Sequence, residues 1–220
     1  MLVDPPGWSS DQPADAKQTI STALESLFRG LRASVVVFPG ERCGLAAKES
    51  GVVKKPLILD FCEYDLDHVT ADIKEIRRYN PQRFEMEQLT AICHEDRQRN
   101  IVVGYKDLGP DEFWARGHMP GMPLMPGVIM CEAAAQLSGY YSQKYRLMTG
   151  MVGFGGLEEV RFRGVVRPGD RFVIVSRLLK LRRAIMTCEF QCFVNQNLVC
   201  EGILKGISLP VDQLTNQQHE

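Results

Sequence analysis

Residues 117–148 read GHMPGMPLMPGVIMCEAAAQLSGYYSQKYRLM, an irregular run of prolines and glycines followed by the one long helical pattern of the chain. Pro126 and Gly127 can begin a helix, because proline fits the first turn, where its missing N–H is not needed. The residues after them are small or apolar on several faces, which is typical of a helix buried on most sides. We therefore predict a central helix from Pro126 to about Met148, ended by the glycines of residues 150–156.

The rest of the folded region has the pattern of strands. Ile101 to Tyr105 is a short apolar run, and the apolar period changes to two over residues 160–194. Turn residues stand at Pro168-Gly169-Asp170, at Arg182-Arg183 and at Asn195-Gln196-Asn197. A long helix followed by antiparallel strands predicts an α+β domain in which the sheet wraps the helix.

The length of 220 residues allows one ordinary domain and an additional segment. We assign residues 1–55 to an N-terminal extension, residues 56–210 to the folded domain and residues 211–220 to a polar tail. The domain is expected to begin with a short helix between Leu66 and Ile76, capped by Asp65 or Asp67. In the extension, residues 20–31 have an amphipathic helical pattern.

Composition excludes several classes of protein. The 26 basic and 27 acidic residues nearly cancel, so the chain does not bind nucleic acid by bulk charge. Seven cysteines without a CxxC pair or a signal peptide predict reduced thiols and a cytoplasmic protein. The longest nearly uncharged stretch contains three prolines and Glu132, which argues against a membrane helix. There is no HExxH motif, and we predict no metal and no cofactor.

Two titratable residues are candidates for chemistry. His118 lies in the rigid loop before the helix, and Glu132 lies in the helix with Cys131 and alanines as neighbours. A carboxylate in such a place is costly unless it is paired, protonated or catalytic, so the two residues form a plausible acid/base pair. The N–H groups around Gly127 and Val128 can bind a developing oxyanion. The alternatives are a surface glutamate and a turn histidine that bonds the start of the helix.

The run from His118 to Gln136 closely resembles HFPGxPxxPGVLxxEAxAQ, the signature of the FabZ-type β-hydroxyacyl-acyl-carrier-protein dehydratases. The similarity continues through residues 156–163 and 166–170, reaches back weakly to residues 80–84, and so covers about residues 72–208. The resemblance implies a hotdog fold, in which an antiparallel sheet wraps a central helix. It also implies a homodimer with active sites at its interface, which in this family commonly assembles into a trimer of dimers.

The resemblance implies a role for each matching residue. His118 takes a proton from C2 of a (3R)-hydroxyacyl thioester, and the partner subunit's Glu132 protonates the departing C3 hydroxyl. Gly127 and Val128 hold the thioester carbonyl with their N–H groups. Gln136 lies one turn beyond Glu132 and orients its carboxyl, although a packing role explains it equally well. The product is a trans-2-enoyl thioester of type II fatty-acid or related lipid biosynthesis.

An acyl carrier protein is acidic, so its docking surface is expected to be basic. Residues 161–183 contain eight basic side chains and one acid, Asp170. Within this segment we select Arg161, Arg163, Arg182 and Arg183 as docking candidates. The alternative is that they are ordinary outward-facing strand residues.

The sequence also departs from the family pattern. Gly153 stands where related dehydratases place the tyrosine that gates the acyl tunnel, Gln82 replaces a histidine, and residues 85–89 replace an apolar run. These changes leave acyl-chain preference open. They also leave two further functions open, a hotdog thioesterase whose carboxylate activates water, and a hotdog protein that binds acyl groups without catalysis.

Overall fold

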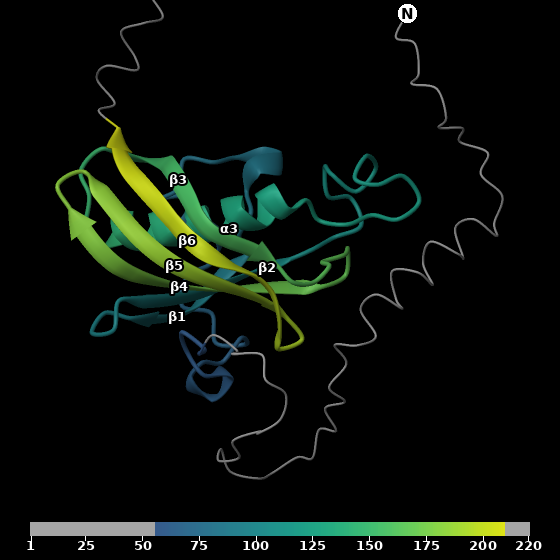
Figure 1. The fold of residues 1–220 in the computed structure, drawn as a ribbon, viewed down its shortest axis with the longest axis horizontal. Helices are drawn as coiled ribbons and strands as arrows, with labels where there is room; N and C mark the ends of the chain where they lie inside the picture. The colour runs from purple at the N-terminus through teal and green to yellow at the C-terminus, as the bar shows by residue number, and fades with distance from the viewer. Residues whose placement is uncertain (1–55, 210–220) are drawn as a thin grey trace, which may run out of the picture. The chain divides into compact units, whose positions relative to one another are not determined.

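A computed structural model describes residues 56–209 as a six-stranded antiparallel sheet curved around one long helix (Figure 1). The helix is α3 (Gly127–Lys144). The strands are β1 (Ala91–Asp96), β2 (Ile101–Asp107), β3 (Met151–Phe162), β4 (Arg171–Arg182), β5 (Ile185–Val194) and β6 (Asn197–Leu209). Their order in the sheet is β1-β2-β4-β5-β6-β3. The predicted hotdog arrangement is confirmed, whereas the predictions for residues 1–55 and 210–220 lie outside the described residues.

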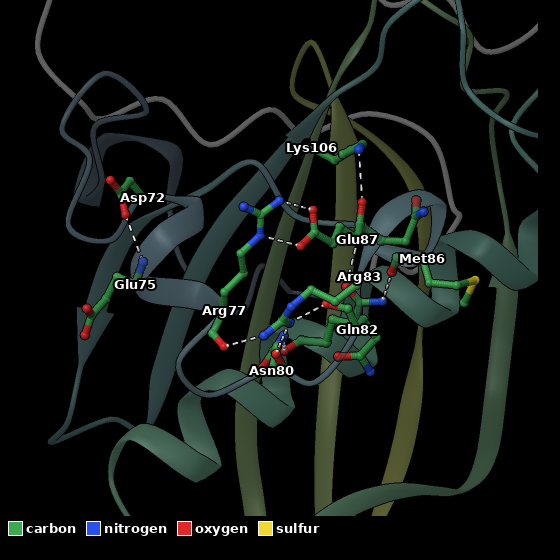
Figure 2. Close-up of polar contacts among 11 residues, drawn as sticks. Asp72, Glu75, Arg77, Asn80, Gln82, Arg83, Met86, Glu87 and Lys106 are labelled. Atoms are coloured by element: carbon green, nitrogen blue, oxygen red, sulfur yellow. Dashed lines mark hydrogen bonds and ion pairs between the residues drawn. The ribbon is translucent and has the colours of Figure 1, made fainter.

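The leading helix is shorter than the sequence pattern predicts. The α2 helix (Ile73–Ile76) begins only after Asp72, whose side chain accepts a hydrogen bond from the Glu75 N–H (Figure 2). Asp65 and Asp67 are therefore not its cap. The reason lies in β1, because the backbones of Thr70 and Ala71 bond to Ile92 and are held extended. Two short 3₁₀ helices, η1 (Phe61–Glu63) and η2 (Phe84–Met86), complete the described helices, none of which is long and apolar enough to cross a membrane.

The first strand is one that the sequence pattern conceals. Residues 94–97 are charged and resemble a solvated turn, but His94 and Glu95 lie within β1. The Glu95 carboxylate is buried and accepts hydrogen bonds from Lys144 and from the hydroxyl groups of Tyr140 and Tyr145. Desolvation and this contact raise the pKa of Tyr145 to about 12. The cluster attaches the C-terminal end of α3 to the edge of the sheet.

The concave face of the sheet holds α3 closely. Ala133, Ala134 and Leu137 are fully buried, as expected for a helix covered on most sides. Gly104 of β2 lies under Leu137, and a Cβ atom there would be only 2.9 Å from the Leu137 Cδ1. A glycine at this position therefore lets the helix approach the sheet. After α3, β3 begins at Met151 and includes Gly153, Gly155 and Gly156, which we expected only to end the helix.

Part of the convex face of the sheet is also covered. Residues 57–66 pack over β2, β4 and β5 and form a second apolar cluster with them. The Gln191 side chain is buried there, accepts from the Ile58 N–H at 2.9 Å and donates to the Pro56 carbonyl at 3.1 Å. The Phe61 ring contacts Phe193 edge-on at 5.0 Å between centroids. Burial on both faces explains why β2 is continuously apolar from Ile101 to Val103.

We predict that Gln191→Leu lowers the free energy of unfolding by about 1–3 kcal/mol, because the backbone groups of Pro56 and Ile58 lose their partner. Urea denaturation measures this loss. Hydrogen exchange is expected to accelerate at residues 57–66 and to remain unchanged in α3. The matched control is Gln98→Leu at an exposed turn, which is expected to change stability by less than about 0.5 kcal/mol. Equal losses in both variants would contradict the role of Gln191.

Candidate active site

His118 lies in an exposed turn immediately before α3. Its backbone N–H donates to the Trp114 carbonyl at 2.8 Å, and its carbonyl accepts from the Leu124 N–H at 2.8 Å. The imidazole Nδ1 is 2.9 Å from the Leu124 carbonyl oxygen. Because a carbonyl only accepts, Nδ1 carries the proton of the neutral ring and Nε2 keeps its lone pair. The loop thus presents His118 in the tautomer that a general base requires.

The start of α3 supplies unpaired backbone donors. The N–H groups of Ile129 and Met130 donate to the Pro126 carbonyl, while those of the two residues before them have no partner within the helix. A Cβ atom at Gly127 would lie 2.7 Å from the Phe162 ring, so a larger residue at this end of the helix requires that ring to move. The Val128 side chain is 72% exposed. The predicted oxyanion donors therefore stand at an accessible helix end.

Glu132 lies one turn further along α3 and is partly buried. Its Oε1 accepts a hydrogen bond of 2.8 Å from the Gln136 Nε2. The same Nε2 donates to the Met86 carbonyl at 2.7 Å, and the Gln136 Oε1 accepts from the Gln88 N–H at 2.9 Å. The structure therefore brings Gln136 to Glu132, as the sequence predicted.

The segment of residues 77–88 surrounds this amide, and Figure 2 shows the side chains of Arg77, Arg83 and Glu87 in that segment. Arg77 binds both carboxylate oxygens of Glu87, at 2.6 and 2.8 Å, which closes the segment on itself. The Arg83 guanidinium donates to the backbone carbonyls of Arg77, Asn80 and Gln82. The Asn80 side chain donates to the Gln136 carbonyl at 3.0 Å. These contacts fix the backbone groups of residues 86 and 88 that hold the Gln136 side chain.

A groove of about 420 Å³ opens beside Glu132. One wall is the face of α3 that carries Glu132, Gln136 and Gly139, and another is the 77–83 stretch. The start of β3 and the middle of β6 complete the groove. Gly153 lies in this lining, and its own Cβ would be 2.5 Å from the Leu209 Cδ1, so a larger residue requires Leu209 to move.

Within one chain the two candidate catalytic side chains remain apart. The His118 ring contacts the Leu124 carbonyl, and the Glu132 carboxylate contacts Gln136. Glu132 lines the groove, whereas His118 does not. Among residues 56–209, no arrangement of three or more histidine, cysteine, aspartate or glutamate side chains is suited to hold a metal ion.

The four candidate docking arginines do not form one surface. Arg161 on β3 pairs across the sheet with Glu201 on β6. Arg182 on β4 pairs with Ile185 on β5, which in turn pairs with Ile207 on β6. Positions 201 and 207 are six residues apart on β6, or roughly 20 Å along the strand. Arg163 is also bound to the buried Glu201 carboxylate at 2.7 Å. Arg182 and Arg183, in contrast, are exposed at the β4–β5 turn, and no ion pair joins them to the described part of the chain.

A family model described as a FabA-like domain matches residues 80–203. The chain belongs to this family. The FabA-like domain thus spans the loop of His118, the whole of α3 and most of the sheet. The resemblance to the FabZ-type dehydratases is confirmed.

Two relatives carry the same printed name, 3-hydroxyacyl-[acyl-carrier-protein] dehydratase FabZ. The protein from Hydrogenobaculum sp. (strain Y04AAS1) is 32% identical over 146 residues, which cover 65% of this chain and 98% of that protein. The protein from Clostridioides difficile (strain 630) is 33% identical over 134 residues, which cover 60% of this chain and 94% of that protein. These alignments account for the FabA-like domain and leave about a third of the chain outside it.

A solved structure supports the fold. One chain of the dehydratase heterocomplex ApeI:P from Xenorhabdus doucetiae superposes with a TM-score of 0.55 at 18% identity. The match covers 66% of this chain and 97% of that chain. At this identity the likeness concerns the arrangement of helix and sheet only.

Sequence reasoning missed the residues that hold Gln136. Asn80 lies in the weakly matching stretch before Arg83, and Gln88 and Glu87 lie where the chain departs from the family pattern. The useful signal was a set of polar side chains between two apolar elements, with an arginine and a glutamate ten residues apart. That spacing has no regular period, so only the folded loop shows the pairing.

We predict that Glu87→Gln lowers the free energy of unfolding by about 1 kcal/mol at pH 7, because Arg77 loses a bidentate partner at a partly exposed site. The hydrogen bond from Arg77 lowers the pKa of Glu87, so the wild-type contribution is present above the unfolded value of about 4.3. It is lost as the pH falls through the folded value. Urea denaturation between pH 7 and pH 3 is therefore expected to show that the free energies of unfolding of wild type and Glu87→Gln become equal at low pH.

The matched control for this measurement is Glu75→Gln, which removes the more exposed ion pair with Arg78. Its effect at pH 7 is expected to be the smaller of the two. A stability difference between wild type and Glu87→Gln that stays constant down to pH 3 would refute the ion-pair explanation.

Proposed function

We propose that this protein dehydrates (3R)-hydroxyacyl groups on acyl carrier protein to trans-2-enoyl groups, in type II fatty-acid or related lipid biosynthesis. The observation that carries the proposal is the arrangement of the His118 to Gln136 run. It combines a base with a free Nε2, open N–H groups at a helix start and a carboxyl held by Gln136. Relatives that align over nearly their whole length are named for this reaction.

The active enzyme is a homodimer in this proposal. His118 and Glu132 make no contact within one chain, so a site that uses both needs a second subunit. β3 is one of the two edge strands, and its exposed side chains include Phe154, Leu157 and Phe162. An unpaired twelve-residue edge with exposed aromatic side chains favours pairing with another copy. Edge pairing brings the His118 loop of one subunit to the groove of the other.

The reaction follows from the positions of the donors. His118 Nε2 removes the C2 proton, and the electron pair of that bond forms the C2–C3 double bond. The C3–O bond breaks, and the partner subunit's Glu132 gives its proton to the leaving hydroxyl, which departs as water. The N–H groups of Gly127 and Val128 hold the thioester oxygen while negative charge develops on it. His118 then returns the proton to the glutamate and resets the site.

Gln136 selects the reactive oxygen of Glu132 in this scheme. Its N–H donates to Oε1, which therefore serves as an acceptor and leaves Oε2 to carry the proton. The buried cysteines of α3 and the sheet carry free thiols, which supports a reducing, cytoplasmic setting; they are Cys93, Cys131, Cys188, Cys192 and Cys200.

The test of this function is hydration of an enoyl thioester, followed by loss of its ultraviolet absorbance. His118→Ala and Glu132→Gln are each expected to lose at least about a hundredfold in rate, the usual contribution of a general acid or base. Release of free thiol without hydration would indicate a thioesterase instead. Binding of the thioester without either reaction would indicate a non-catalytic acyl-binding protein.

Mixing the two variants tests the shared site. A dimer of one His118→Ala chain and one Glu132→Gln chain has one site with both native residues only if each site takes its histidine and glutamate from different subunits. Random reassortment then restores about a quarter of wild-type activity. Each variant mixed with itself serves as the control. No recovery after verified subunit exchange would contradict the shared site.

The carrier is proposed to dock at the β4–β5 turn. Arg182 and Arg183 are exposed and free of acidic partners within residues 56–209, whereas Arg163 is bound to Glu201. A basic surface at this position complements an acidic carrier.

Reversing both charges, Arg182→Glu with Arg183→Glu, is expected to lower kcat/KM on carrier-linked substrate at least about tenfold and to weaken its salt dependence. The rate on a small-thiol enoyl thioester is expected to remain unchanged. Steady-state kinetics with both substrates measures the difference. Arg161→Glu is the comparison variant, because Arg161 lies near the end of β3 that packs against the start of α3. A larger loss of kcat/KM in that variant would indicate that the carrier docks near the start of α3 instead.

A further inference from the structure

The groove beside Glu132 lies between one face of α3 and residues of β3, β5 and β6. The α3 residues that line the groove include Glu132, Ala135 and Gly139, and the opposite wall contains Met186 and Leu204. At Gly139 an added Cβ would meet no atom within 4 Å, so the space above the helix is open at that level. Met186 itself is 2% exposed and is part of the apolar core between α3 and the concave face of the sheet.

A second, smaller cavity of about 10 Å³ lies behind this wall. That volume is close to the smallest that admits one water molecule. Its lining includes Ser138, Ser142, Ser176 and Leu178. The Ser138 and Ser176 hydroxyl groups bond to each other at 2.8 Å, and the Ser142 hydroxyl is buried without a partner in the described structure.

Met186 is the one described residue that lines both cavities. It lies over Gly206, where an added Cβ would be 2.5 Å from the Met186 Cε and 2.9 Å from its Cγ. The absence of a side chain at position 206 therefore gives the methionine its place. A thioether side chain is unbranched and flexible, so the wall between the two cavities is thin and adaptable.

We propose that Met186 sets the upper limit of acyl-chain length, an inference that rests on the proposed dehydratase function. With C3 of the substrate at Glu132, the acyl tail extends along α3 toward Gly139. These two residues are seven apart, or about 10 Å along the helix axis. The tail then meets Met186. Chains that end before this wall fit the groove, and longer chains require the methionine to move.

The experiment measures kcat/KM for hydration of enoyl thioesters of increasing chain length. Met186→Ala joins the groove to the cavity behind it and is expected to raise the ratio of long-chain to short-chain kcat/KM at least about tenfold, since one methylene changes such ratios by that factor or more. Met186→Val is the milder truncation, expected to move the ratio in the same direction if the alanine variant fails to fold.

Gly139→Leu tests the same groove in the opposite sense. Its side chain enters open space and improves helix propensity, so the variant is expected to fold and to lose activity on the longest substrates first. Met148→Ala is the matched control, because Met148 is a buried methionine that lines neither cavity. Its truncation is expected to leave the chain-length profile unchanged.

The outcomes separate the two proposals. Failure of the wild type to hydrate an enoyl thioester of any length would overturn the proposed function itself. An active wild type whose profile does not move in the Met186 variants would overturn the role of Met186, even if Gly139→Leu shortened the accepted chain. A profile that moves equally in Met148→Ala would do the same, because the effect would then come from general loosening of the core.

Discussion

The amide of Gln136 is buried between α3 and the 77–88 segment, and both of its N–H hydrogens and its oxygen have partners. One hydrogen goes to Glu132 and the other to the Met86 carbonyl, while the oxygen accepts from the Gln88 N–H. Such a group is costly to bury unless every partner is in place. The amide therefore fixes the position of the 77–88 segment, the wall of the groove and the orientation of the carboxyl together.

The partners of the Gln136 amide are themselves held in place by further contacts. The Met86 and Gln88 backbone groups are held because Arg77 and Glu87 close the segment and Arg83 bonds its carbonyls. The position of Gln136 relative to the sheet also depends on α3, because Ala133, Ala134 and Leu137 pack that helix against the sheet. Gly104 permits that approach. A change in the ion pair can thus reach the site without touching substrate.

The sequence predicted the elements that have a regular period. The central helix, the antiparallel strands and the proximity of Glu132 and Gln136 all follow from spacing of 3.6 or 2 residues. β1 escaped prediction because the charged side chain of Glu95 is turned into a buried cluster at the end of α3. The separation of Arg161 from Arg182 also escaped, because the strand order places residues that are close in sequence at different levels of the sheet. The side chains around Gln136 come from an irregular loop, and no period marks such a contact.

The cover over the convex face has a consequence for the order of folding. Ile58 and Gln191 are 133 positions apart, so the hydrogen bond between them closes nearly the whole described chain. During synthesis, residues 57–66 leave the ribosome long before β5 exists, and their apolar side chains have no sheet to cover. Contacts of this separation form slowly, because the closure entropy comes before the gain from packing. The contacts that hold the leading segment on the sheet are therefore complete only after β5 has been made.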